Sequence, residues 1–417
     1  MEDSSGDRNG PRHSPSSILN ARHSVDGGSR VRLKELALLF TRLGFTAFGG
    51  PAVHVAMMED EVVTRRQWMD RQHFMDLVAS VNFVPGPNST ELAIHVGYIR
   101  AGVPGLVVAG VCFITPAVMI ILPLAFFYVR SGQLPQISAA MSGINACVVA
   151  IVAAAAVRFA GSAITDKLTT ILAIAAALIG FVGIRHPEIQ PELLALALAA
   201  VVGAVYYGRP RIGASVAPLL LPLAVSPAQW RDFGKMSLFF LKVGATLFGS
   251  GYVLVSYLQI GLVDQFQWLT KSQLLDAISV GQVTPGPLLT TATFIGYVLG
   301  AVRFNGGVTG GVIGAIAATI AIFLPSFLFI LVLGRVLPRI RTNRYARGAL
   351  DAMNAAVVAL IAVVCWRLAG DALVPDGKPD AFAIAIAALS FVAMMWKNIN
   401  ATWLIVAAGL LGLIRLI

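Results

Sequence analysis

The stretch VNFVPGPNSTEL at residues 81–92 decides the fold, because no helix runs straight through its Pro85-Gly86-Pro87. Each proline lacks a backbone donor and clashes with the preceding turn, and the glycine between them permits a sharp change of direction. A proline also suits the first position of a new helix. The sequence therefore predicts two half-helices, with Pro87 at the first position of the second one, which runs through Asn88 toward Tyr98.

The same break returns 200 residues later as Pro285-Gly286-Pro287. An offset of 200 also relates LGFTAFGG at residues 43–50 to VGATLFGS at residues 243–250. Farther along, extra glycine-rich sequence in the second copy raises the offset to 209, which relates Pro116 to Pro325 and Asn145 to Asn354. Repetition on this scale indicates a transporter built from two similar halves.

The composition is that of a protein embedded in a bilayer. Of 417 residues, 57% are apolar and 12% are charged, and segments 104–129 and 308–333 carry no charge. About 20 mostly apolar residues cross the hydrocarbon core, and about six segments in each half are candidates. We therefore predict an all-α polytopic membrane protein with two homologous helical repeats and broken helices at the Pro-Gly-Pro motifs.

The chain divides into four predicted parts. Residues 1–31 are polar, rich in Ser, Gly and Arg, and lack the apolar core of a signal peptide, so they are expected to form a disordered cytoplasmic tail. Residues 32–208 form the first membrane repeat, residues 209–231 a linker, and residues 232–417 the second repeat.

Loop charge favours an inverted relation between the repeats. Residues 335–347 hold five arginines, whereas the corresponding loop of the first half holds only Arg130. Because cytoplasmic loops collect Lys and Arg, equivalent loops are expected on opposite sides of the membrane. Arg65, Arg66 and Arg71 oppose this orientation, since it would place them outside. The same rule accounts for the formal charge of +10, and no basic, aromatic-rich polar domain suggests nucleic-acid binding.

The two breaks are candidate anion sites. The start of each second half-helix presents unpaired N–H groups and the positive end of a helix dipole, which suit an oxyanion. A kink that serves packing alone is the alternative. Cations within apolar segments usually have a partner or a substrate. The predicted substrate-binding residues come from the breaks, the glycine motifs and two equivalent cations: Arg42, Gly49, Gly50, Asn88, Ser89, Thr90, Lys242, Gly249, Thr290 and Thr291.

Ionisable groups beside the break occur only in the first half. Glu91 and His95 lie four residues apart, on one face of the second half-helix. Together with His54 they are candidates for a proton-linked step. The alternative is a structural role, in which they hydrogen-bond each other or a neighbouring helix. The three cysteines are unclustered, so neither a metal site, a disulfide framework nor a cofactor is expected.

At these motifs the chain resembles the chromate ion transporter family in its long form with two homologous halves. The resemblance rests on FTRLGFTAFGGPAVH, NFVPGPNSTELAIHVGY, FFLKVGATLFGSGYVL and ISVGQVTPGPLLTTATFIGYVLGA, and it spans residues 33 to 417. It implies a multi-pass inner-membrane carrier that exports chromate, driven by the membrane potential or an ion gradient. No GxxxxGK[ST] motif is present to supply ATP hydrolysis.

Two alternatives stay open at this point. The same fold could carry sulfate or another tetrahedral oxyanion, because helix ends and cations recognise charge and shape. An intramembrane enzyme using His54, Glu91 and His95 is the distant alternative, but it lacks a HExxH motif or a comparable ligand set. A homo-oligomer is compatible with the sequence.

Overall fold

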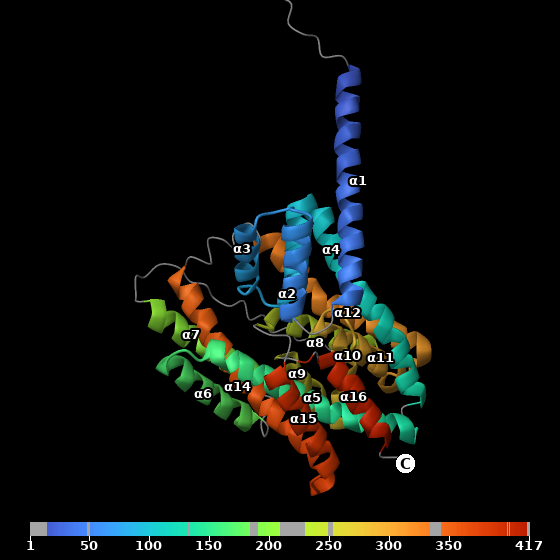
Figure 1. The fold of residues 1–417 in the computed structure, drawn as a ribbon, viewed down its shortest axis with the longest axis vertical. Helices are drawn as coiled ribbons and strands as arrows, with labels where there is room; N and C mark the ends of the chain where they lie inside the picture. Colours follow the sequence, from blue (N-terminus) through green and yellow to red (C-terminus); the bar gives the residue numbers. More distant parts are fainter. Residues whose placement is uncertain are drawn as a thin grey trace, which may run out of the picture.

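The computed structural model describes residues 15–47, 51–131, 134–183, 191–208, 230–248, 253–333, 343–397, 399 and 401–414. Within these residues every regular element is a helix and no strand occurs, which confirms the predicted all-α class (Figure 1). Of the described helices, α4, α5, α12 and α14 are long and apolar enough to cross a membrane.

The two repeats contain corresponding elements, except that the single helix α4 of repeat one corresponds to η4, α11, η5 and α12 of repeat two, and η6 occurs in repeat two alone among the described residues. Repeat one consists of α1 (Pro15–Thr46), α2 (Pro51–Glu59), the π-helix η1 (Asp60–Arg65), α3 (Arg71–Val81), α4 (Asn88–Ser131), α5 (Pro135–Ala163), α6 (Lys167–Gly183) and α7 (Pro191–Gly208). Repeat two consists of α8 (Trp230–Thr246), α9 (Val253–Leu258), η3 (Gln259–Gln265), α10 (Lys271–Val283), η4 (Leu288–Thr290), α11 (Thr291–Val298), η5 (Leu299–Arg303), α12 (Gly307–Leu333), α14 (Arg344–Leu373), η6 (Pro375–Gly377), α15 (Ala381–Lys397) and α16 (Ala401–Ile414).

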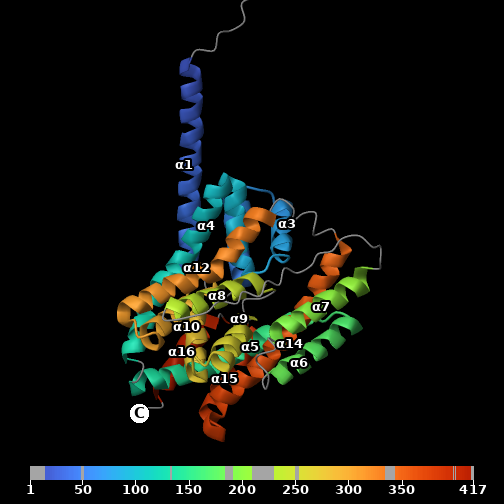
Figure 2. The ribbon, with the colours of Figure 1, turned by 180° about the vertical axis from the view of Figure 1, so that it is seen from behind.

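The N-terminal segment differs from the prediction. Residues 15–31, expected to be a disordered tail, are part of the 32-residue helix α1, which projects from the body of the molecule (Figures 1 and 2). Pro15 stands at the first helical position, where its missing N–H costs nothing, and no later proline interrupts the helix. Residues 1–14 lie outside the described part of the chain.

Both Pro-Gly-Pro motifs lie between helices. The helix α3 begins after Asp70, whose carboxylate accepts a bond from the His73 amide (2.7 Å), and it ends at Val81. The helix α10 begins with a capping box at Thr270 and ends at Val283. The chain resumes as a helix only after the second proline of each motif, with α4 in one repeat and η4 in the other. Each break therefore separates two helical segments, the first of which has a capped N-terminus.

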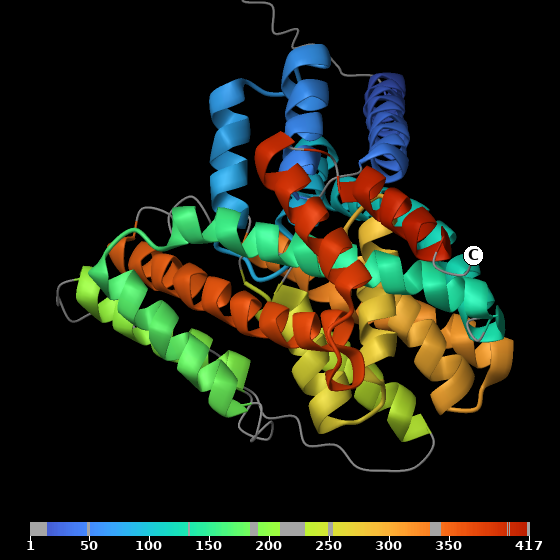
Figure 3. The same ribbon diagram turned by 60° about the horizontal axis from the view of Figure 1, so that its bottom comes forward.

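The repeats are interlocked through their last helices. The pair α6 and α7 of repeat one packs against α14 of repeat two, while α15 and α16 pack against α5 of repeat one (Figure 3). Two equivalent glycines make close approaches between the repeats. A Cβ on Gly203 of α7 would meet the Gly348 carbonyl oxygen of α14, and one on Gly412 of α16 would meet the Ala139 carbonyl oxygen of α5. Each repeat therefore completes the packing of the other.

Gly203→Ala and Gly412→Ala are expected to lower the melting temperature of the purified protein by similar amounts. The added methyl forces two helix backbones apart, at a cost of ~1–3 kcal/mol. Gly161→Ala and Gly370→Ala are matched controls at equivalent positions with open space around them, and they should not lower it. Equal losses in all four variants would contradict the interlocked packing.

Candidate functional site

The two helix breaks are joined by reciprocal hydrogen bonds between the repeats. The amide of Gly86 donates to the carbonyl of Leu247 (2.6 Å), and the amide of Gly286 donates to the carbonyl of Ala47 (3.1 Å). Ala47 and Leu247 are equivalent residues that directly follow α1 and α8. We call this junction the crossing: the two Pro-Gly-Pro motifs and the two carbonyls that bind them. It brings both breaks to one place.

Side chains from the following segments support the ends of α1 and α8. His54 Nε2 bonds to the Ala47 carbonyl (2.9 Å), and the Tyr257 hydroxyl donates to the Thr246 carbonyl (3.0 Å). Because a carbonyl only accepts, the proton of a neutral His54 lies on Nε2. This leaves Nδ1 as an acceptor, and it is buried without a partner among the described residues. His54 therefore belongs to the crossing as a support for the Ala47 carbonyl.

Polar atoms after the break in repeat one are buried and unsatisfied. Thr90 and Glu91 are 0% exposed, and Ser89 and His95 are at most 5% exposed. The Thr90 hydroxyl, both Glu91 carboxyl oxygens and His95 Nδ1 meet no hydrogen-bond geometry with the described residues. Glu91 and His95 thus do not bond each other. Asn88 donates to Asn82 Oδ1 (2.6 Å), but its own side-chain oxygen is unpaired.

Ser326 of α12 adds a group from repeat two that the sequence did not single out. A Cβ on Gly86 would meet both Glu91 Oε1 and Ser326 Oγ, so these side chains flank the glycine from opposite repeats. Ser326 is 0% exposed, and its hydroxyl is also unsatisfied within the described chain. The available signal was its place directly after Pro325, where repeat one has Ala117 after Pro116.

At the equivalent positions of repeat two, the side-chain hydroxyls are hydrogen-bonded within their own segment. Thr290 donates to the Pro287 carbonyl (2.7 Å) and Thr291 to the Leu288 carbonyl (2.8 Å). Gly286 faces the Ala117 side chain, which a Cβ on the glycine would approach to 3.2 Å. The crossing therefore has symmetric backbone bonds, but the hydroxyls after the break are satisfied in repeat two, whereas Thr90 is unsatisfied in repeat one.

For the two predicted cations, Arg42 and Lys242, the structure shows contacts outside the crossing. Arg42 is half-exposed and forms an ion pair with the buried Glu61, which Arg65 and Arg66 also contact (3.4 and 3.3 Å). Lys242 is partly buried on α8, where its carbonyl accepts a bond from Thr246 (2.8 Å). The predicted residues Gly49, Gly50 and Gly249 lie outside the described residues.

Known proteins resemble this chain over nearly its full length. The family model for the chromate transporter matches twice, over residues 34–204 and 234–413. A chromate transport protein of Cupriavidus metallidurans is 30% identical over 407 residues, which cover 94% of this chain and 96% of the relative. One of Pseudomonas aeruginosa is 30% identical over 402 residues, covering 91% of each. An uncharacterized transporter of Methanocaldococcus jannaschii is 26% identical over 422 residues, covering 95% and 98%. No solved structure matches.

Gly86→Ala is expected to lower the melting temperature more than Gly102→Ala. Both glycines have positive φ, +144° and +63°, so each substitution adds ~1–3 kcal/mol of backbone strain. Only at Gly86 does the new methyl also displace Glu91 and Ser326, because the space around Gly102 is open. Equal destabilisation would show that these two side chains do not enclose Gly86.

Proposed function

The chain belongs to the chromate transporter family, and on that basis we propose that it is a secondary-active carrier of the inner membrane that exports chromate and confers chromate resistance. The chromate transport proteins among its relatives support chromate as the substrate. Membership of a transporter family favours transport over the alternative of an intramembrane enzyme. The double match of one family model also agrees with the two-repeat architecture of a secondary transporter.

The observation that carries the proposed site is the group of unsatisfied polar atoms at the crossing. A buried donor or acceptor without a partner costs about 1–3 kcal/mol, and Thr90, Glu91, His95 and Ser326 each carry at least one; Glu91 and Ser326 both lie beside Gly86. A tetrahedral oxyanion would accept bonds from the Thr90 and Ser326 hydroxyls. The first amides of α4 and the positive end of its dipole would add to the attraction.

Glu91 limits how such an anion can bind. A carboxylate in a low-dielectric site repels a dianion strongly at contact distance. A protonated Glu91 has no charge and can donate its O–H to the anion. We propose that Glu91 carries a proton while chromate is bound, which links the proton to the substrate. Arg42 is left out of this site because its guanidinium group is already ion-paired with Glu61.

Repeat two contributes fewer groups to the proposed site than the sequence suggested. The hydroxyls of Thr290 and Thr291 donate to carbonyls one turn back, so they are not available to donate to an anion in this conformation. Ser326 is the contribution from repeat two, because it faces Glu91 across Gly86. The anion would therefore bind between α4 and α12.

Vesicles containing the purified protein are expected to exchange external labelled chromate for internal chromate. Protein-free vesicles and vesicles containing the heat-denatured protein are the controls. Absence of exchange would contradict the proposed function. If unlabelled sulfate competes as well as unlabelled chromate, the carrier is a general transporter of tetrahedral oxyanions, because hydroxyls and helix ends recognise shape and charge.

Thr90→Val should weaken chromate binding about tenfold, or ~1.4 kcal/mol, measured as the half-saturating concentration for exchange. The substitution removes an unsatisfied hydroxyl and preserves the shape of the side chain. Thr290→Val is the matched control, because its hydroxyl already donates to its own helix. Equal effects of both substitutions would place the anion elsewhere.

A further inference from the structure

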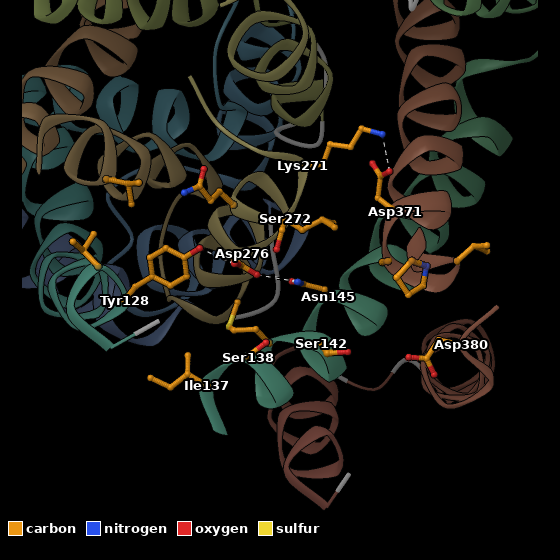
Figure 4. Close-up of a pocket in the computed structure, with 18 of the residues that line it drawn as sticks. Tyr128, Ile137, Ser138, Ser142, Asn145, Lys271, Ser272, Asp276, Asp371 and Asp380 are labelled. Carbon is orange, nitrogen blue, oxygen red and sulfur yellow. Dashed lines mark hydrogen bonds and ion pairs between the residues drawn. The ribbon is translucent and has the colours of Figure 1, made fainter. Parts of the chain in front are cut away.

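A second polar site lies between the repeats, in a cavity of about 800 Å³ that shares no residue with the crossing. Its wall is formed by the end of α4, the start of α5, the first turns of α10 and the chain around the end of α14 (Figure 4). Tyr128, Asn145 and Asp276 meet on one side of it. Asp276 is only 6% exposed, and the cavity is its opening to water.

Hydrogen bonds hold both oxygens of Asp276. Asn145 Nδ2 donates to Oδ1 (2.9 Å), and the Tyr128 hydroxyl donates to Oδ2 (2.7 Å). The Ser279 hydroxyl donates to Asn145 Oδ1 (2.7 Å), which fixes the orientation of that amide. The position of Asp276 early in its helix suggests a helix-starting role. The structure assigns that role to Thr270 instead, and Asp276 binds repeat one.

The two oxygens of Asp276 are not equivalent chemically. The fixed amide can only donate to Oδ1, whereas a tyrosine hydroxyl can donate or accept. A proton entering from cavity water would therefore add to Oδ2. The new O–H would donate to the Tyr128 oxygen, and the tyrosine hydrogen would rotate away. No bond between heavy atoms changes, and water supplies the proton.

The charged groups around this carboxyl pair mainly with one another. Lys271 of α10 bonds Asp371 of α14 (2.8 Å), and Arg367 of α14 holds Asp264 of η3 with two bonds (2.7 and 2.8 Å). Asp380 lies at the far side of the cavity, before α15. The segments of α5 and α16 that pack against α10 bring no charged side chain. An acid-lined cavity of this kind repels an oxyanion and accepts a proton.

From this geometry we propose that Asp276 is a proton-binding site of the carrier, separate from the anion site and reached through the cavity. The inference rests on the proposed transport function. Asp276 lies on α10, which leads directly into Thr284 and the break at Pro285. Its bonds to α4 and α5 connect that half-helix to repeat one. Protonation of Asp276 replaces its charge-assisted hydrogen bonds to Tyr128 and Asn145 with weaker neutral ones. It therefore weakens the link between α10 and repeat one.

The test uses Asp276→Asn in vesicles with two readouts, chromate exchange at equal pH and chromate uptake driven by an imposed pH gradient. We expect exchange to persist and gradient-driven uptake to fall at least about tenfold, because the amide cannot take up the proton. Asp380→Asn is the matched control in the same cavity. Asparagine caps a helix as well as aspartate, so both readouts should be unchanged.

Tyr128→Phe provides a second variant that keeps the ring packed against Phe294. It should reduce gradient-driven uptake and leave exchange unchanged, since only the hydroxyl partner of Oδ2 is lost.

Gradient-driven uptake that survives in Asp276→Asn overturns the inference. Loss of exchange in a stable Asp276→Asn variant also overturns it, by placing Asp276 in the anion path. Uptake driven by a sodium gradient and abolished by the same substitution would identify sodium as the bound ion in place of the proton. Absence of exchange in the wild type would instead refute the proposed transport.

Discussion

Backbone polar groups freed by a helix break must find partners within a membrane protein, because lipid offers none. In this chain each break finds one in the opposite repeat. Gly86 donates to Leu247 and Gly286 donates to Ala47, so the groups that each repeat exposes are satisfied by the end of a helix in the other. The ends of α1 and α8, the positions of His54 and Tyr257, and the approach of α4 to α12 all depend on this exchange.

The backbone symmetry of the crossing contrasts with the difference between its side chains. Thr290 and Thr291 satisfy their hydroxyls on their own helix, whereas Thr90, Glu91 and Ser326 retain unmet bonding capacity. A stable helix end and a binding site need different side chains at the same positions. Polar groups that are already hydrogen-bonded stabilise the fold, whereas polar groups without a partner are available to bind a ligand.

The spacing of residues in the sequence was sufficient to identify which residues of the two repeats are equivalent. It was not sufficient to predict which residues of the two repeats are in contact. The constant offsets identified both breaks, because Pro and Gly have local backbone effects wherever they occur. Ser326 was missed because its role comes from facing Gly86 across the repeat boundary. The bonds of Asp276 could not be predicted for the same reason, because its partners Tyr128 and Asn145 are distant in the sequence. Arg42 was expected near the anion, but its ion pair with Glu61 depends on how η1 folds back on α1.

The exchanged packing of the last helices has a consequence for synthesis. The helix α5 emerges early, yet its partners α15 and α16 follow it by more than 200 residues. The pair α6 and α7 must likewise wait for α14. Small-residue surfaces on the first repeat, such as that around Gly203, therefore face lipid during much of translation. Assembly of the carrier is a late event, and a truncated chain would be inserted in the membrane without being able to close its core.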